Sequence, residues 1–351
     1  MDYYLVEHVV YQYLLPAVCI PGVCAAALSA VIFARMRQTS LEVLLCGLSI
    51  FDVLLLTCTL LIYPAIHSCG QQENQMNSLV CHFFWKSALL TFPISVIAQT
   101  GSVWTCVAVT LDRFIAVSYP IRKRVLCTPN TSLAVLLGVT FFSVIFKIPA
   151  FLEIQLNEAG VLVDTDLRKN QLYQKIYMTY LYTAIIVVVP WTIIIVLNVI
   201  VIRKVRIAYQ IQANMTLCRP NNSRCRREEG ERKVTVMATV MTGIFILCNI
   251  PPTLCNSVES FLPDLKQNFR PIIPLSNLLV CVNSASNMLI YCVFNQKFRR
   301  AVIKIFRKNK GLDKGRLPSR REESKTMMRE SSTTAILVND KLITRTTMNS
   351  F

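Results

Sequence analysis

Seven long apolar stretches constrain this chain more than any other feature. Each exceeds the roughly 20 apolar residues that a helix needs to cross a bilayer. They run approximately over residues 13–34, 41–66, 83–119, 132–152, 176–202, 234–262 and 271–294. A composition that is 53% hydrophobic and 16% charged over 351 residues is far too apolar for a soluble domain. The sequence therefore predicts an all-α membrane protein, built as a seven-transmembrane helix bundle.

The basic residues predict the orientation of the bundle. The net charge of +17 is concentrated in alternate short loops between spans and in the last 57 residues. Lys and Arg on alternate loops follow the positive-inside rule, so we expect a multi-pass plasma-membrane protein with its N-terminus outside and its C-terminus inside. The same placement argues against nucleic acid as a partner.

The chain divides into three expected regions. Residues 1–12 are expected to form a short extracellular N-terminus, and residues 13–308 the transmembrane domain. This domain ends in a short amphipathic eighth helix at residues 295–308, whose basic and apolar faces suit the lipid at the inner membrane surface. Residues 309–351 are polar and charged, which is typical of a disordered cytoplasmic tail.

Charges within or beside the apolar stretches are the first functional candidates, because ionisable groups at membrane depth are costly. Asp52 lies in the middle of the second stretch, in GLSIFDVLLL. Asp112 and Arg113 follow residues 87–111, which contain no charged residue. The alternative for Arg113 is a side chain that reaches the interface and only anchors a helix end.

Five runs in order along the chain carry a family resemblance: PISVIAQTGSVW (93–104), SYPIRKRVLCTP (118–129), IPAFLE (148–153), LCNIPP (247–252) and NSASNMLIYCVFNQKFRR (283–300). Together with Asp112-Arg113-Phe114, where the family usually has Asp/Glu-Arg-Tyr, they resemble rhodopsin-like G-protein-coupled receptors. The chain is most similar to invertebrate FMRFamide-like neuropeptide receptors. The resemblance covers roughly residues 40–307.

The resemblance implies a switch set at the inner end of the bundle, made of Asp112, Arg113, Glu231 and Tyr291. In the family, an acid at the position of Glu231 often pairs with the third-helix Arg when the receptor is off. The alternative for Glu231 is a solvated charge among its charged neighbours. Tyr291 closes a motif similar to the family's Asn-Pro-x-x-Tyr, without the proline.

The resemblance also implies a polar core that holds a sodium ion in the inactive state. Its candidates carry a carboxylate, two hydroxyls and two amides, which suit a hard cation; they are Asp52, Ser102, Asn283, Ser284 and Asn287. The alternative is a buried hydrogen-bond network without an ion. We expect no other cofactor, because the three histidines are scattered and no CxxC pair occurs.

For the ligand, an RFamide peptide offers a cationic Arg and an amidated aromatic end. Phe92, Gln99 and Asn256 are expected to meet the amidated end, and Glu259 the Arg. Glu259 is alternatively a solvated helix-end charge.

One departure from the family concerns its usual outer disulfide. Ala88 stands at the position of one of the two cysteines, and residues 150–180 contain no second one. Cys69 and Cys81, in the loop expected outside, are candidates for a different, local bond.

The expected function is that of a G-protein-coupled receptor, not an enzyme. It would be activated by an extracellular amidated, FMRFamide-like peptide and signal to a heterotrimeric G protein. Arrestin and a receptor kinase are expected to act on the tail, which is rich in Ser and Thr. The alternative is an orphan chemosensory or signalling-silent seven-helix receptor, which the missing disulfide keeps open. A transporter is disfavoured because the chain shows no internal repeat. A retinal photoreceptor would need a lysine in residues 271–294, and an amine receptor an acid in place of Ser95.

Overall fold

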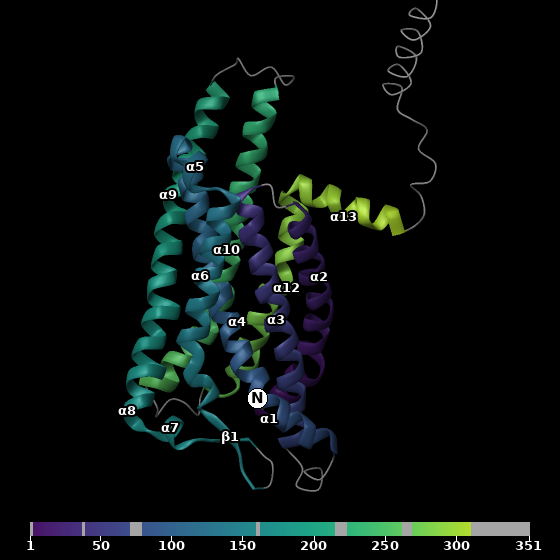
Figure 1. Ribbon diagram of the computed structural model, residues 1–351, viewed down its shortest axis with the longest axis vertical. Coiled ribbons are helices and arrows are strands. Elements are labelled where there is room, and N and C mark those ends of the chain that lie inside the picture. The colour runs from purple at the N-terminus through teal and green to yellow at the C-terminus, as the bar shows by residue number, and fades with distance from the viewer. Residues whose placement is uncertain are drawn as a thin grey trace, which may run out of the picture. The chain divides into compact units, whose positions relative to one another are not determined.

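The computed structural model describes residues 3–36, 39–70, 79–158, 162–214, 223–261 and 269–309. Within these ranges, seven helical segments are long and apolar enough to cross a membrane. They lie side by side in one bundle (Figure 1). The predicted seven-helix fold is therefore confirmed.

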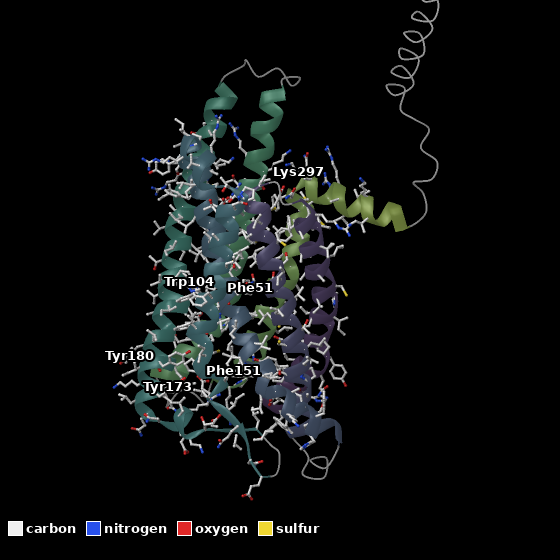
Figure 2. The ribbon with its side chains drawn as sticks, viewed as in Figure 1. Phe51, Trp104, Phe151, Tyr173, Tyr180 and Lys297 are labelled. Atoms are coloured by element: carbon white, nitrogen blue, oxygen red, sulfur yellow. A yellow bond between two sulfur atoms is a disulfide. The ribbon has the colours of Figure 1, made fainter. Side chains whose placement is uncertain are left out.

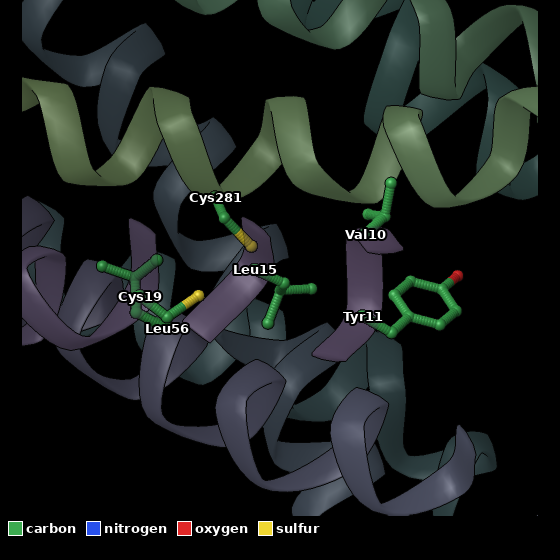
Figure 3. Packing of buried hydrophobic residues seen from close by; sticks show 6 residues of the cluster. All are labelled: Val10, Tyr11, Leu15, Cys19, Leu56 and Cys281. Atoms are coloured by element: carbon green, nitrogen blue, oxygen red, sulfur yellow. The ribbon is translucent and has the colours of Figure 1, made fainter. Parts of the chain in front are cut away.

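The first span begins earlier than the sequence predicts. Helix α1 (Tyr3–Val9) continues through a π-helical turn, η1 (Val10–Leu14), into α2 (Leu15–Met36). Residues 3–12 are thus helical rather than a separate terminal segment. The helix extends because Val10 and Tyr11 are buried in a cluster with Leu15, Cys19, Leu56 and Cys281 (Figure 3).

The remaining spans agree with the predicted ones to within a few residues at most ends. They are α3 (Ser40–Gly70), α4 (Leu79–Ser118), α6 (Pro129–Lys147), α9 (Val189–Asn214), α10 (Ser223–Phe261) and α12 (Ile272–Phe294). A short helix, α5 (Pro120–Leu126), follows α4 after Tyr119, because Pro120 cannot donate the hydrogen bond that would continue α4. Helix α10 extends well before its apolar stretch into the basic segment.

The fifth span has an unusual outer half. After α7 (Asp166–Lys169) and α8 (Gln171–Tyr173), it winds as two π-helical segments, η4 (Gln174–Leu181) and η5 (Thr183–Val188). Regular α-helix resumes at Val189, one residue before Pro190. The proline ring would clash with the carbonyl four residues earlier in a regular α-helix, and a widened turn before it relieves that clash.

The loop between the fourth and fifth spans forms a small hairpin that the sequence analysis did not predict. A 3-10 turn, η3 (Ile148–Phe151), leads into β1 (Ile154–Leu156), which pairs antiparallel with β2 (Leu162–Asp164). The hairpin lies at the same end of the bundle as α1 (Figure 1).

Small residues allow α3 and α4 to approach their neighbours closely. A Cβ atom added at Gly47 would lie 2.2 Å from a methyl carbon of Leu136 on α6. One added at Gly101 would lie 2.4 Å from the ring of Phe51, at mid-height in the bundle (Figure 2). Membrane helices use small residues in this way because packing, not water exclusion, holds them together.

Helix α13 (Gln296–Asn309) follows α12 after Asn295. The chain divides into two compact units, residues 1–299 and 300–351, so only the first residues of α13 belong to the bundle. Of these, Phe298 is fully buried, and Lys297 Nζ lies 4.0 Å from Glu42 Oε1 at the start of α3. From residue 310 onward, the predicted tail lies outside the residues that the structure describes.

Candidate functional site

The Asp112–Arg113 pair lies at the last turns of α4, and both side chains are buried. Arg113 Nε donates to Asp112 Oδ2 at 3.1 Å, and a second Arg113 nitrogen pairs with the same oxygen. Ser40, at the first residue of α3, donates to the other oxygen of Asp112 and contacts the Ser132 hydroxyl on α6. Ser40 thus links the Asp112 carboxylate on α4 to both α3 and α6. Arg113 lies 8% exposed in an ion pair, whereas a side chain that only anchors a helix end would extend to the interface.

Glu231 lies on α10, but its side chain is outside the described part of the chain. The pairing of Glu231 with Arg113 therefore stays a prediction. In the structure the buried guanidinium is compensated by the adjacent Asp112, as a buried charge requires.

Cys127, which follows α5, is a contact of this cluster that the sequence analysis did not single out. Its thiol lies 4.0 Å from the backbone oxygen of Asp112. Burial, followed by the negative charge of Asp112, raises the pKa of Cys127 to about 11. The only sequence signal was a cysteine in a basic loop, which is not specific.

Tyr291 is fully buried near the same end of the bundle. Its hydroxyl donates to Met241 Sδ at 3.7 Å, which links α12 to α10. Its ring meets the Phe33 ring edge-on at 5.0 Å and the Phe298 ring at 5.6 Å. The residue therefore contacts three other elements that a rearrangement of the bundle would have to separate.

The predicted polar core is only partly assembled by direct hydrogen bonds. Asn287 Nδ2 donates to Asp52 Oδ2 at 2.8 Å, across 235 residues of sequence. Ser102 and Asn283 are buried on α4 and α12 but make no hydrogen bond to that carboxylate in the described structure, and Ser284 lies near it without reaching ordinary hydrogen-bond distance.

Two buried oxygens in this core are left without a hydrogen-bond partner among the described residues. They are Asp52 Oδ1 and Ser284 Oγ. An unsatisfied buried carboxylate oxygen is costly, because its lost hydration is not replaced. A carboxylate and a hydroxyl with free lone pairs are also the donor set that a hard cation prefers, so the residues fit a sodium ion.

At the other end, a cavity opens between α3, α4 and α12. Its empty volume is ≈ 510 Å³, including the space at its open mouth. Phe92 and Gln99, both predicted to meet a ligand, line it. Among the described residues, the rest of the lining is uncharged and comes from the same three helices: Leu55, Thr59, Ile62, Tyr63, Ser95, Val96, Asn277, Val280 and Cys281.

The structure brings two of the four predicted ligand contacts together. Asn256 and Glu259 lie on α10, and their side chains are outside the described residues, so their roles stay predictions. Sequence reasoning missed Tyr63 and Asn277, although a polar group inside an apolar span was an available signal.

Tyr11 joins the first helix to the wall of this cavity. Its hydroxyl accepts a hydrogen bond from Asn277 Nδ2 at 3.1 Å, and its ring lies 4.9 Å from that of Tyr63. The sequence analysis had placed Tyr11 in a separate N-terminal segment. A tyrosine outside the predicted span gave no sign of this contact.

A disulfide joins Cys69 and Cys81, with 5.7 Å between their Cα atoms. The two residues cluster with Phe84 and Ala88, and Leu162 of the hairpin packs against them. Ala88 stands where the resemblance leads one to expect a cysteine. The Cys69–Cys81 disulfide lies beside Ala88 and closes a local loop, in place of the family's usual outer disulfide.

A buried lysine near the hairpin was also missed. Lys147, 7% exposed at the end of α6, places Nζ 4.5 Å from the centroid of the Tyr182 ring and 5.0 Å from that of Phe146. Glu153, a few residues on, accepts a hydrogen bond from Tyr173 at 2.7 Å. Ring faces stabilise a cation that has little contact with water, so this cluster holds the fifth span against the fourth.

Comparison with known proteins agrees with this geometry. Residues 25–291 match the family model described as "7 transmembrane receptor (rhodopsin family)". The chain is 31% identical over 299 residues to FMRFamide peptide receptor frpr-18 of Caenorhabditis elegans, which covers 82% of this chain and 66% of that protein. It is 28% identical over 304 residues to the FMRFamide receptor of Drosophila melanogaster, covering 82% and 52%. The somatostatin receptor type 1 of Rattus norvegicus is 23% identical over 299 residues, covering 84% and 71%.

The chain thus aligns with between about half and two thirds of the length of the first two relatives. The family model, by contrast, matches most of the chain itself, from within the first span to Tyr291. The chain therefore belongs to the rhodopsin family of seven-transmembrane receptors.

Proposed function

We propose that this chain is a plasma-membrane receptor that is activated by an amidated, FMRFamide-like peptide and signals to a heterotrimeric G protein. Its family and the printed names of two relatives support a peptide receptor. The N-terminus would lie outside, so that the cavity faces the ligand and the Asp112–Arg113 cluster faces the G protein.

The cavity lining that the structure describes is uncharged, and this observation carries the choice of ligand. An amidated C-terminus is neutral, donates through N–H and accepts through its carbonyl. The side-chain amides of Gln99 and Asn277 supply both complements, and Phe92 offers an aromatic face. A free carboxylate would lose its hydration there, and none of the described lining residues is a cation that could replace it.

The Asp112–Arg113 cluster supports a switch at the opposite end. In the structure Arg113 is held by Asp112, which Ser40 also holds. Agonist would favour an arrangement in which Arg113 leaves this cluster and becomes available to the G protein. Such a ligand acts by its higher affinity for one of two packings of the bundle.

The polar core is proposed to hold a sodium ion that favours the inactive packing. Asp52 and Ser284, with their unpartnered oxygens, would bind it, and Asn287 would orient the carboxylate. The ion would supply the positive charge that the buried carboxylate lacks. A network completed by water is the alternative.

Arrestin and a receptor kinase are the further proposed partners. Their expected target, the Ser- and Thr-rich segment 319–350, lies outside the described residues. Phosphorylation there would add negative charge that a basic surface of arrestin binds.

The test is a comparison of two peptides that differ only in the C-terminal group. Cells that express the receptor receive the amidated peptide or its free acid, and a second messenger is recorded. The amide should be at least about tenfold more potent, which corresponds to about 1.4 kcal/mol of binding free energy.

A variant of the cavity makes the comparison specific. Gln99→Lys places a cation where the carboxylate of the free acid would lie. This variant should therefore reduce or reverse the higher potency of the amide over the free acid. Equal potency of amide and acid on the unaltered receptor would contradict the assigned ligand class. Silence towards all amidated peptides, at normal surface expression, would favour the chemosensory or signalling-silent alternative.

A further inference from the structure

Two histidines that are far apart in sequence meet at the end of the bundle opposite Arg113. His8 lies on α1 and is exposed, and His67 lies in the last turn of α3 and is 6% exposed. His8 Nδ1 and His67 Nε2 are 2.8 Å apart, with ring centroids separated by 5.0 Å. One ring therefore donates its N–H to the lone pair of the other.

The scaffold on both sides of this pair is well braced. Gln12, one helical turn after His8, donates to the Pro64 carbonyl at 3.1 Å and to the Ser68 hydroxyl at 2.7 Å. Cys69, two residues after His67, is fixed by its disulfide to Cys81. The two imidazoles are therefore held together by contacts other than their own.

We propose that His8 and His67 form a two-histidine site for a divalent transition-metal ion of the zinc type. Imidazole nitrogen is a preferred ligand of such ions, and the pair is accessible to them from the side of His8, which is exposed.

The geometry is close to that of a chelate. Two nitrogens bound tetrahedrally at 2.0–2.1 Å from zinc lie roughly 3.3 Å apart. The present separation of 2.8 Å must therefore widen by about 0.5 Å, which the exposed His8 side chain allows.

The proton count balances without a co-reactant. Each neutral ring has one N–H and one lone pair. The ring that now donates moves its proton to its other nitrogen, and both facing lone pairs then bind the ion. Among the described residues no third His, Cys, Asp or Glu joins the pair, and water can fill the remaining coordination positions.

An ion at this position acts on the helix whose Tyr11 contacts the cavity wall. Tyr11 follows His8 by three residues and contacts Asn277 in the cavity wall. Bridging His8 to His67 therefore clamps the first helix onto α3 beside the cavity mouth. This consequence concerns stability and does not depend on the identity of the ligand.

The test measures thermal unfolding of the full-length, detergent-solubilised receptor with a chelator or with zinc chloride. Zinc at ten times its dissociation constant should multiply the ratio of folded to unfolded protein by about 11 and raise the melting temperature. His8→Ala should abolish this rise. His82→Ala is the matched control, because the chain has only three histidines and His82 is also exposed and next to the disulfide. The His82→Ala variant should retain the full zinc-induced rise in melting temperature.

His67→Gln tests the second ligand in the same way. Because His67 is buried, this variant is used only if its melting without zinc shows that it folds. The exposed His8 variant carries the test in either case. Absence of a zinc-induced rise in the unaltered receptor would overturn the proposal. So would a rise that persists in His8→Ala, or one that His82→Ala reduces equally.

Discussion

Replacing Gly101 by alanine should destabilise the bundle at its polar core. An added Cβ atom would lie 2.4, 2.5 and 2.7 Å from three ring carbons of Phe51. Ordinary contact begins near 3.4 Å, so the ring would have to withdraw by about 1 Å. Phe51 is only 6% exposed and has little room to move, and its neighbour Asp52 would be displaced with it.

The expected cost follows from the overpacking of buried cores, which is typically about 1–3 kcal/mol. This lowers the ratio of folded to unfolded receptor by about 5- to 150-fold. Gly138→Ala is the matched control, because it lies within α6 and nothing lies within 4 Å of its added Cβ atom. That change should be neutral or stabilise by up to about 1 kcal/mol, since alanine favours helix over glycine.

Thermal melting of the two solubilised variants, without ligand, gives the comparison. Phe51→Leu removes the ring and should recover part of the loss in Gly101→Ala, with a coupling of about 0.5–3 kcal/mol. The reasoning fails if Gly101→Ala melts like the unaltered receptor. It also fails if its loss is unchanged in the Phe51→Leu background, because the clash would then not be the cause.

The other predictions concern the switch, the ion and the tail. Arg113→Ala should abolish the second-messenger response while surface ligand binding persists, since Arg113 lies far from the cavity; loss of binding with signalling intact would contradict its assignment. Asp52→Asn should remove any sodium dependence of agonist affinity, because a neutral amide cannot balance a cation in the bundle; a wild-type receptor indifferent to sodium would leave only the network alternative. Since its pKa is raised to about 11, the Cys127 thiol should be alkylated slowly at neutral pH, with a rate that rises about tenfold per pH unit until it levels off near pH 11. Asp112→Asn should lower that pKa and speed the reaction at pH 8, as followed by mass spectrometry of the tryptic peptide; a plateau near pH 8.5 in the unaltered receptor would refute the raised pKa. Truncation after Asn309 should slow desensitisation, and unchanged desensitisation would argue against kinase and arrestin acting on the tail.

The seven spans could be predicted from sequence because length and hydropathy are local properties of a stretch of chain. The exceptional positions of Asp52 and of Asp112 with Arg113 were visible for the same reason. A charge after a long apolar stretch is recognisable without knowing which helix lies beside it. The order of the motifs added the family. The chemistry of an RFamide peptide then pointed to Phe92 and Gln99, which line the cavity.

The contacts between spans could not be predicted in this way. They depend on how each helix is rotated and tilted against its neighbours, which hydropathy leaves open because lipid-facing and helix-facing residues are both apolar. Ser40 reaches Asp112 only because the start of α3 lies beside the end of α4. Tyr11 reaches the cavity only because the first helix begins before its apolar stretch and lies against α3 and α12.

Composition and local pattern thus determined the number of helices and which charges are exceptional. Tertiary structure decided which side chains, 59 residues apart for His8 and His67 and 235 for Asp52 and Asn287, come within hydrogen-bonding distance. The physical reason is that a hydrogen bond requires placement within a few tenths of an ångström. Only the packing of the whole bundle sets positions to that accuracy.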